Sequence, residues 1–246
     1  MAVLELAGIS KRFGAIEALA GVDLALGEGE VLGLMGDNGA GKSTLVKIIA
    51  GNYPPSEGEI RLAGRPVRFA SPGEARGAGI ELVHQDLALC DNLPAALNVF
   101  LGRELVHKIG PFRFLDRTAM YARAEKLFAE LKSETRPRDL VVSMSGGQRQ
   151  AVAIARTRLT DPKIVLLDEP TAAISVRQVG EVLEMIRNLR ETGHAIILIS
   201  HRMPDVFAVA DRVAVLRRGQ KVADKTISGT SPEEVTGLIT GAIEVA

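Results

Sequence analysis

The sequence predicts an α/β fold built on a parallel sheet, and two patterns indicate it. Three short, nearly all-apolar runs, 31–35, 164–167 and 195–199, have the composition of strands buried on both faces. Helical stretches lie between them, among them 176–190, where apolar side chains recur at helical spacing. Buried strands that alternate with helices are typical of a parallel sheet with helices on its faces.

The N-terminal part of the sequence predicts two further strands and a strand-loop-helix unit. Residues 3–9 and 16–26 have the alternation expected of strands. The strand at 31–35 leads into a glycine-rich loop, and a helix is predicted over 43–50, ending before Gly51. The loop therefore lies at the carboxyl end of a sheet strand, where ligands of such folds bind.

From about residue 91 to residue 159 the pattern is mostly helical, with no comparable apolar strand. Asp116 can cap a helix in which apolar side chains recur at helical spacing: Met120, Ala124, Leu127, Phe128 and Leu131. We expect one domain, 1–246. Its α/β core spans about 1–90 and 160–246, and a helical subdomain of about 91–159 is inserted into that core.

The composition excludes several classes of protein. Thirty basic and thirty acidic residues give a net charge of zero, so nothing in the overall charge indicates nucleic acid or an anionic membrane surface as a partner, and any phosphate chemistry must be local. One cysteine, Cys90, allows no internal disulfide and no zinc pair, which indicates a reducing compartment. The longest stretch free of charged residues, 92–102, is too short to cross a bilayer, and no signal peptide is recognisable. We expect the chain to stay in the cytoplasm.

The glycine-rich loop matches the pattern G-x-x-x-x-G-K-[ST] of phosphate-binding loops. Its residues are Gly36, Asp37, Asn38, Gly39, Ala40, Gly41, Lys42, Ser43 and Thr44. Glycines let backbone N–H groups approach phosphate oxygens, Lys42 would contact the outer phosphates, and the Ser43 hydroxyl would bind Mg²⁺. A plain glycine-rich turn is the alternative, but the strand before it and the helix after it favour a phosphate site.

Polar side chains follow the other two apolar strands. Asp168 and Glu169 end the strand at 164–167, where Asp168 would hold Mg²⁺ and Glu169 would orient or deprotonate a water molecule. Two solvated acids at a strand end are the alternative. His201 follows the strand at 195–199 and could reach a terminal phosphate, although a structural role fits its position equally well.

A second glycine motif, Ser145, Gly146, Gly147 and Gln148, precedes a helix. The spacing of Ser145 and Gln148 is that of a capping box, so a well-capped helix is one interpretation. Glycines in the first turn also leave backbone amides open to an anion, which is the second interpretation.

In chain order, these four motifs resemble those of the ATPase subunit of an ABC transporter, over essentially the whole chain. The resemblance implies ATP and Mg²⁺ as cofactors, and a parallel core with an N-terminal antiparallel β subdomain and a helical insertion. It also implies that Phe13 stacks on adenine and that Gln85, which follows a strand at 80–83, contacts Mg²⁺ or water and signals to the helical subdomain. In that family two copies face each other, so that residues 145–148 of one close over the nucleotide held by the other.

Three segments, 170–173, 201–207 and 210–213, resemble carbohydrate importers, and a chain with one ATPase domain is similar to fructose-type subunits. The resemblance implies a homodimer at the cytoplasmic face of the inner membrane, held there by integral-membrane permease subunits. A periplasmic sugar-binding protein would be an indirect partner, and nucleic acid would not be one. Two positions depart from the family: Ser175 stands where many members have aspartate, and Met144 replaces leucine.

Other interpretations explain less of the sequence. GTPases are disfavoured because Asn-Lys-x-Asp and Asp-x-x-Gly motifs are missing from the sequence, and a small-molecule kinase gives no account of residues 145–148. A nucleic-acid or ribosome clamp with an ABC-type ATPase, or a transporter of another substrate, remains the alternative. A set of apolar residues either receives a helix of a membrane subunit or packs inside the helical subdomain: Leu87, Leu89, Leu93, Leu97, Val99, Phe100 and Leu101.

Overall fold

The computed structural model describes residues 2–172 and 174–243, and its core is a six-stranded sheet in the order β12-β11-β3-β10-β9-β6. The strands are β3 (Val31–Gly36), β6 (Ile80–Val83), β9 (Ile164–Asp168), β10 (Ala195–Ile199), β11 (Arg212–Arg217) and β12 (Gln220–Thr226). From β11 to β6 all neighbours are parallel, and β12 pairs antiparallel with β11 at one edge. The three apolar runs form the central strands β3, β9 and β10, as predicted.

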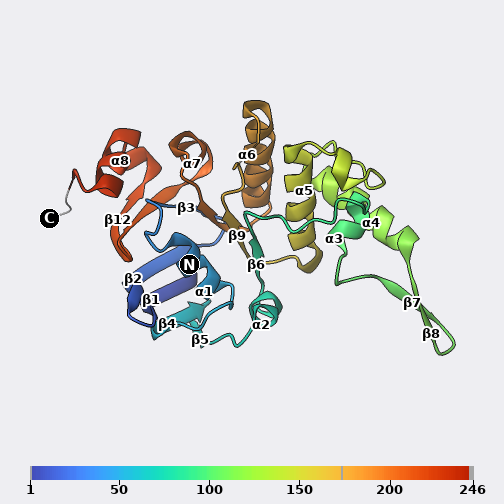
Figure 1. Ribbon diagram of the computed structural model, residues 1–246, viewed down its shortest axis with the longest axis horizontal. Helices are drawn as coiled ribbons and strands as arrows, with labels where there is room; N and C mark the ends of the chain where they lie inside the picture. The colour runs from blue at the N-terminus through green and yellow to red at the C-terminus, as the bar shows by residue number, and fades with distance from the viewer. Residues whose placement is uncertain (1, 173, 244–246) are drawn as a thin grey trace.

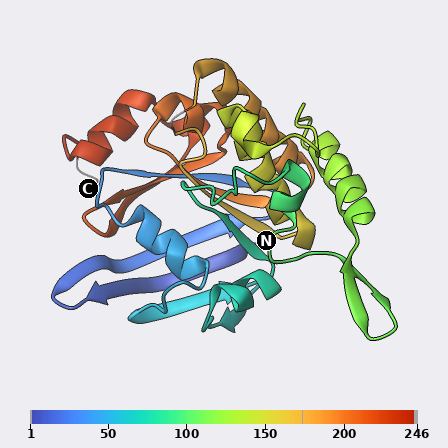
Figure 2. The same cartoon turned by 45° about the vertical axis from the view of Figure 1, so that its right-hand side comes forward.

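A second, antiparallel sheet lies beside the first, in the order β2-β1-β4-β5. Its strands are β1 (Ala2–Phe13), β2 (Ile16–Gly27), β4 (Glu57–Leu62) and β5 (Arg65–Val67). Helix α1 (Lys42–Ile49) buries its apolar side between the two sheets, in a core that both sheets share. Figure 2 shows α1 above the antiparallel sheet. The N-terminal β unit and the helix after the loop are thus confirmed.

Three helices cover the other face of the parallel sheet: α6 (Val176–Glu191), α7 (Met203–Val209) and α8 (Pro232–Thr240) (Figure 1). The predicted apolar stripe of α6 is buried against the sheet: Val179, Leu183, Ile186 and Leu189. Short elements complete the chain: α2 (Pro72–Gly77) and the 3-10 turns η1 (Val141–Ser143), η2 (Arg158–Thr160) and η3 (Ile227–Gly229).

The helices between β6 and β9 pack together at one end of the sheet: α3 (Ala95–Val99), α4 (Arg117–Glu130) and α5 (Gly146–Thr157). Asp116 caps α4 as predicted, since its carboxylate accepts a hydrogen bond from the Ala119 N–H at 3.0 Å. All five residues of the predicted apolar spacing in α4 and just after it are buried in the larger core. None of the helices in the described ranges is long and apolar enough to span a membrane.

The same region contains an antiparallel hairpin, β7 (Val106–Ile109) and β8 (Phe112–Leu115), that was not predicted from the sequence. All eight strand residues are exposed, and each strand has only four residues, so neither carries the sustained apolar run or alternation by which buried strands are recognised. The region is mostly helical, and the strands that it does contain are short and exposed, unlike the buried apolar strands of the central sheet.

The apolar residues between Leu87 and Leu101 were expected either to receive a helix of a membrane subunit or to pack inside the helical subdomain, and the structure gives different answers for different residues. Val99 and Phe100 are buried in the core, and Leu87, Leu89 and Leu97 pack against it. Internal packing therefore accounts for these residues. A role in docking a membrane subunit remains a prediction for the exposed Leu101 and for Leu93.

Candidate functional site

The glycine-rich loop leaves β3 at Gly36 and enters α1 at Lys42, and two of its glycines are required by packing. At Gly36, with φ of 152°, a Cβ would lie 2.2 Å from the Leu216 carbonyl oxygen of the neighbouring strand β11. At Gly41, with φ of 103°, a Cβ would lie 2.8 Å from the Ala18 carbonyl oxygen. The loop is therefore held closely between β2, β3 and β11.

Lys42 is buried inside the loop. Its Nζ donates to the carbonyl oxygens of Gly36 at 2.7 Å and Asp37 at 2.9 Å. Burial lowers the pKa of the Lys42 ammonium, and the negative charges of Glu169, Asp37 and Asp168 oppose that shift. A cation in this position lies beside any anion that the loop amides bind.

The loop lines a pocket of about 220 Å³ that also contains the predicted acids. Its lining comprises Ala18, Asn38, Gly39, Ala40, Gly41, Lys42, Ser43, Thr44, Gln85, Asp168, Glu169 and Ile199. The register of the sheet explains why the loop and the acids lie together. Ile199 pairs with both Asp168 and Leu34, so strands β3, β9 and β10 end at the same edge of the sheet. The structure thus brings together the loop, Gln85, Asp168 and Glu169.

Asp168 is partly buried and lies near the negative charge of Glu169. Burial raises the pKa of its carboxyl group, and the charge of Glu169 raises it further. Lys47, His84 and Lys42 oppose the rise. A divalent cation at this carboxylate would remove much of the cost of keeping it ionised.

The donors around Asp168 fit Mg²⁺ better than a metal bound by protein alone. Ser43 supplies a hydroxyl and Gln85 an amide oxygen on the same pocket as the carboxylate. The described part of the chain has no group of three or more His, Cys, Asp or Glu side chains placed to hold a metal ion. Few protein oxygens, with phosphate oxygens and water completing the shell, are the usual environment of Mg²⁺ in nucleotide sites.

Glu169 is held in an unusual backbone conformation directly after β9. Its φ is 52°, and its N–H donates to the Ile199 carbonyl oxygen at 3.0 Å. Its side chain is 13% exposed, whereas that of His201 is 63% exposed. Nδ1 of His201 lies 2.8 Å from Oε2 of Glu169, and the His201 N–H donates to the same oxygen at 3.4 Å. His201 therefore contacts Glu169 and is absent from the lining of the phosphate pocket.

Phe13 is exposed at the end of β1 and belongs to a small aromatic group. Its ring meets that of Tyr53 edge to face at 5.5 Å, and Nζ of Lys11 lies 5.2 Å from the Phe13 centroid. Tyr53 was not predicted as a site residue. It is one of two tyrosines and follows α1 closely, which is the one signal that the sequence offers.

The second glycine motif starts α5, and the capping box is present. The Ser145 N–H donates to Oε1 of Gln148 at 3.0 Å, and the Gln148 N–H donates to the Ser145 hydroxyl oxygen at 3.2 Å. A Cβ at Gly146 would lie 2.5 Å from Cγ2 of Ile174, and one at Gly147 would lie 2.8 Å from Oε2 of Glu181. Both glycines thus allow close packing, Gly146 against the segment before α6 and Gly147 against α6 itself, and anion binding remains a prediction.

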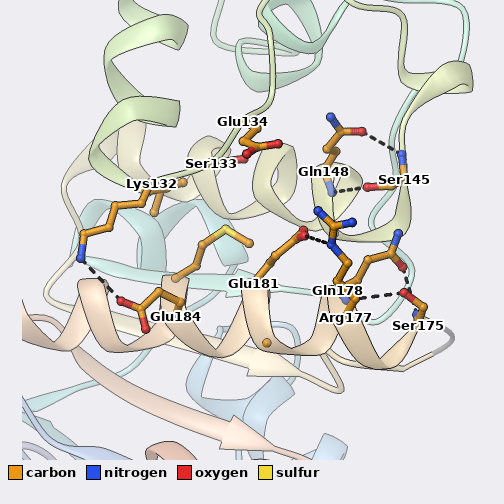
Figure 3. A pocket seen from close by; sticks show the side chains of 14 residues that line it. Lys132, Ser133, Glu134, Ser145, Gln148, Ser175, Arg177, Gln178, Glu181 and Glu184 are labelled. Carbon is orange, nitrogen blue, oxygen red and sulfur yellow. Dashed lines mark hydrogen bonds and ion pairs between the residues drawn. The ribbon is translucent and has the colours of Figure 1, made fainter.

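This helix start borders a separate pocket of about 580 Å³ (Figure 3). The pocket is lined by Leu131, Lys132, Ser133, Glu134, Ser145, Gly147, Gln148, Ser175, Arg177, Gln178, Gly180, Glu181, Glu184 and Met185. Lys132 pairs with Glu184 at 3.5 Å and Arg177 with Glu181 at 3.8 Å. This 580 Å³ pocket shares no lining residue with the 220 Å³ pocket of the glycine-rich loop. Within one chain, residues 145–148 therefore do not reach the loop of residues 36–44.

Arg156, in the last turn of α5, is a linking residue that was not predicted. Its guanidinium donates to the carbonyl oxygens of Leu87 at 3.5 Å, Ala88 at 3.3 Å and Asn98 at 3.2 Å. It therefore joins the segment that follows Gln85 to the helix that begins at Ser145. An arginine in the apolar final turn of a helix was the available signal.

Two of the segments that resemble carbohydrate importers meet in space. The buried Thr171 hydroxyl donates to Oδ2 of Asp205 at 2.6 Å, and Nε of Arg202 lies 3.3 Å from the same oxygen. The segment 170–173 and the segment 201–207 are thereby joined next to Glu169 and His201. Ala173, at the end of the first segment, lies outside the described residues.

Comparison with known proteins finds relatives that share one description, that of ATP-binding proteins of ABC transporters or of sugar import. The sequence model of a family described as ABC transporter matches residues 19–172. The chain is 44% identical to the xylose/arabinose import ATP-binding protein XylG of Sulfolobus acidocaldarius, with 97% of this chain and 94% of the relative covered. It is 46% identical to the fructose import ATP-binding protein FrcA of Rhizobium meliloti, with 98% and 95% covered.

A third relative is longer. The chain is 42% identical to a ribose import ATP-binding protein, RbsA 2, of Escherichia coli, and spans 46% of its length. Among solved structures, an ATP-binding cassette of an ABC transporter in its ADP conformation has a TM-score of 0.83 and 26% identity, with 98% of this chain and 95% of that one covered. A dimeric cassette in a post-hydrolysis state with ADP and phosphate has a TM-score of 0.75 and 26% identity, covering 92% and 100%.

Proposed function

The chain belongs to the ABC transporter family of ATP-binding subunits and is an ATPase of that family, and from this premise we propose that it energises the import of a monosaccharide through partner permeases. The observation that carries the proposal is the 220 Å³ pocket, where the phosphate loop, Gln85, Asp168 and Glu169 meet. A pocket with loop amides, one cation and two acids suits a nucleoside triphosphate and a water molecule.

In the proposed complex, the loop from Gly36 to Thr44 binds the phosphates of ATP, and Lys42 contacts the outer ones. Ser43, Asp168 and Gln85 would hold Mg²⁺, which neutralises phosphate charge when it is bound. The exposed Phe13 ring, supported by Tyr53, offers the flat apolar face on which adenine would stack.

Glu169 is the proposed general base. Its Oε2 is engaged by His201, which leaves Oε1 to accept a proton from the attacking water. Its backbone hydrogen bond to Ile199 and its φ of 52° fix the direction from which the carboxylate enters the pocket. In this scheme His201 is a positioning residue for Glu169, and it would contact the terminal phosphate only in the closed complex.

The proposed active assembly is a homodimer with two nucleotides between the subunits. Each motif occurs once in the chain, and residues 145–148 border a different pocket from the phosphate loop. A second copy placed head to tail would bring its Gly146 and Gly147 amides to the nucleotide. The dimeric cassette with ADP and phosphate, which resembles this chain, supports the arrangement.

The substrate and location are inferred from the relatives. Their names specify import of xylose or arabinose, fructose and ribose, so a monosaccharide is the proposed cargo. The chain would then work at the cytoplasmic face of the cell membrane, bound to integral-membrane permeases, with a periplasmic sugar-binding protein as an indirect partner. Its net charge of zero fits the expectation that nucleic acid is not a partner.

A purification from membranes tests this function. Tagged wild-type chain should be recovered with an integral-membrane permease and should support ATP-dependent uptake of a labelled pentose or hexose after reconstitution. Lys42→Ala should keep the permease but lose ATP binding and uptake, because the loop loses its only cation for the phosphates. Recovery with nucleic acid and without a membrane protein would contradict the proposal.

A further inference from the structure

The β7–β8 hairpin extends from the body of the protein, beyond α3 and α4 (Figure 1, Figure 2). It forms a two-stranded sheet of its own, and each of its strand residues is exposed. Isolated two-stranded hairpins are at best marginally stable in water, and this one exposes five large apolar side chains: Val106, Ile109, Phe112, Phe114 and Leu115. Such a ribbon would be stabilised by a contact surface, and the rest of the chain, as far as the structure describes it, does not supply one.

The cross-strand register shows how far each pair of side chains lies from the turn of the hairpin. Ile109 faces Phe112 next to the Gly110-Pro111 turn, and both are more than 60% exposed. The next pair along the strands is Lys108 with Arg113, about 3.3 Å further from the turn. The hairpin therefore has an apolar tip followed directly by a pair of cations.

The hairpin carries only positive charges, although the whole chain has a net charge of zero. No Asp or Glu occurs between Glu104 and Asp116. Lys108 and Arg113 lie directly opposite each other, and like charges in that position destabilise an antiparallel pair. An anionic surface above the tip would relieve this repulsion.

We propose that the hairpin inserts, tip first, into the headgroup region of an anionic lipid bilayer. Phe112 and Ile109 lie at the boundary with the acyl chains, and Lys108 and Arg113 bind lipid phosphates. The two pairs are only about 3.3 Å apart along the strands, so both lie within the shallow depth, about 5–10 Å, at which interfacial segments are buried. This surface goes beyond the proposed function and does not depend on ATP.

The exposure pattern favours lipid over a protein partner. Residues of a strand alternate between its two faces, so Phe112 and Phe114 lie on one face and Lys108 and Arg113 on the other. Both faces are exposed along the whole ribbon. A protein surface would cover one face and leave the other in water, whereas lipid headgroups surround a ribbon that enters them end on.

A tryptophan probe gives a direct test, because the chain contains no tryptophan. Full-length Phe112→Trp is mixed with vesicles of phosphatidylcholine, with and without phosphatidylglycerol. With phosphatidylglycerol, the emission of Trp at position 112 should shift to the blue and be quenched by brominated acyl chains. The matched control is Ile16→Trp, at the tip of the β1–β2 hairpin, where Glu17 pairs with Arg12. Unchanged emission at position 112, or equal quenching at both positions, would overturn the proposal.

Charge removal supplies the second test, by flotation of full-length protein with the same vesicles. Lys108→Gln with Arg113→Gln should weaken binding about fivefold for each cation, or about 25-fold together, which corresponds to about 1 kcal/mol per cation. Arg65→Gln with Arg68→Gln removes two exposed cations near β5 and should bind as the wild type does. Equal loss in both double variants would show non-specific attraction and refute insertion.

A third outcome separates lipid from protein. If wild-type chain does not bind vesicles but the hairpin variants lose a permease subunit during purification, the surface contacts protein and the lipid assignment is wrong. ATP hydrolysis by the hairpin variants should equal that of the wild type, so this test can fail while the proposed ATPase function stands.

Discussion

Two glycines of the phosphate loop, Gly39 and Gly41, differ in how closely their surroundings pack. Replacing each with alanine separates the cost of steric overlap from the cost of backbone strain. Both Gly39, with φ of 80°, and Gly41, with φ of 103°, have backbones that side chains disfavour. A Cβ at Gly39 meets no atom within 4 Å, whereas one at Gly41 would lie 2.6 Å from Cδ2 of Leu19 and 2.8 Å from the Ala18 carbonyl oxygen. Leu19 is fully buried, so it has no free space into which to move.

The expected free energies of unfolding follow from these contacts. Strain from the positive φ should cost about 1–3 kcal/mol in both Gly39→Ala and Gly41→Ala. Overpacking should add about 1–3 kcal/mol in Gly41→Ala alone, because one of the clashing atoms is backbone. For a chain of this size each kcal/mol lowers the melting temperature by about 2–4 °C. Gly41→Ala should therefore melt several degrees below Gly39→Ala.

Thermal unfolding followed by circular dichroism, without nucleotide, measures the difference. Urea midpoints of the two variants should rank in the same order, with equal slopes. If Gly39→Ala and Gly41→Ala lose the same stability, contact with β2 does not constrain the loop, and the glycine at 41 is explained by backbone conformation or phosphate approach alone.

Three further variants test other parts of the site and its support. Glu169→Gln should slow ATP hydrolysis about 10²- to 10⁴-fold while ATP binding persists, and unchanged turnover in the reconstituted transporter would rule out the base. Arg156→Met should lower the free energy of unfolding in urea by about 1–3 kcal/mol, because three carbonyl oxygens each lose a hydrogen bond, whereas Arg149→Met, which removes an ion pair with the exposed Asp91, should have almost no effect. Burial, and then the charge of Arg158, lowers the pKa of His194 below its usual 6.5, so the folded state binds fewer protons than the unfolded one as pH falls through 6.5. Stability should therefore drop below about pH 6.5 in the wild type and less steeply in His194→Gln, and parallel pH profiles would contradict this.

The central sheet was predictable because its strands are buried on both faces. The runs at 31–35, 164–167 and 195–199 contain only residues that a fully buried strand accepts. Strands β4 and β12 have mixed burial, and their polar residues interrupt any simple pattern. The β7–β8 hairpin is exposed on both faces, and its strands are only four residues long, so they carry none of the sustained patterns that burial imposes.

The candidate site was predictable where motif and sheet geometry act together. A loop after one parallel strand and acids after another must meet at the carboxyl edge, and register places Asp168 beside Ile199 there. The contact between His201 and Glu169 could not be predicted, since it depends on the φ of 52° at Glu169 and on the rotamers of two side chains. The link from Arg156 to Leu87 and Ala88 likewise joins residues almost seventy positions apart, and an arginine in the last turn of α5 does not by itself indicate which residues it contacts.

The departure at Ser175 has a structural explanation that limits its consequences. Ser175 caps α6 with a complete capping box: its N–H donates to Oε1 of Gln178 at 3.0 Å, and its hydroxyl oxygen accepts from the Gln178 N–H at 3.5 Å. Aspartate caps helices as well as serine does, so either residue satisfies the fold at this position. They differ in charge. Ser175 borders the pocket of residues 145–148, where the second subunit is proposed to dock. We therefore expect the missing charge to affect assembly and communication between the two sites rather than the folding of one chain.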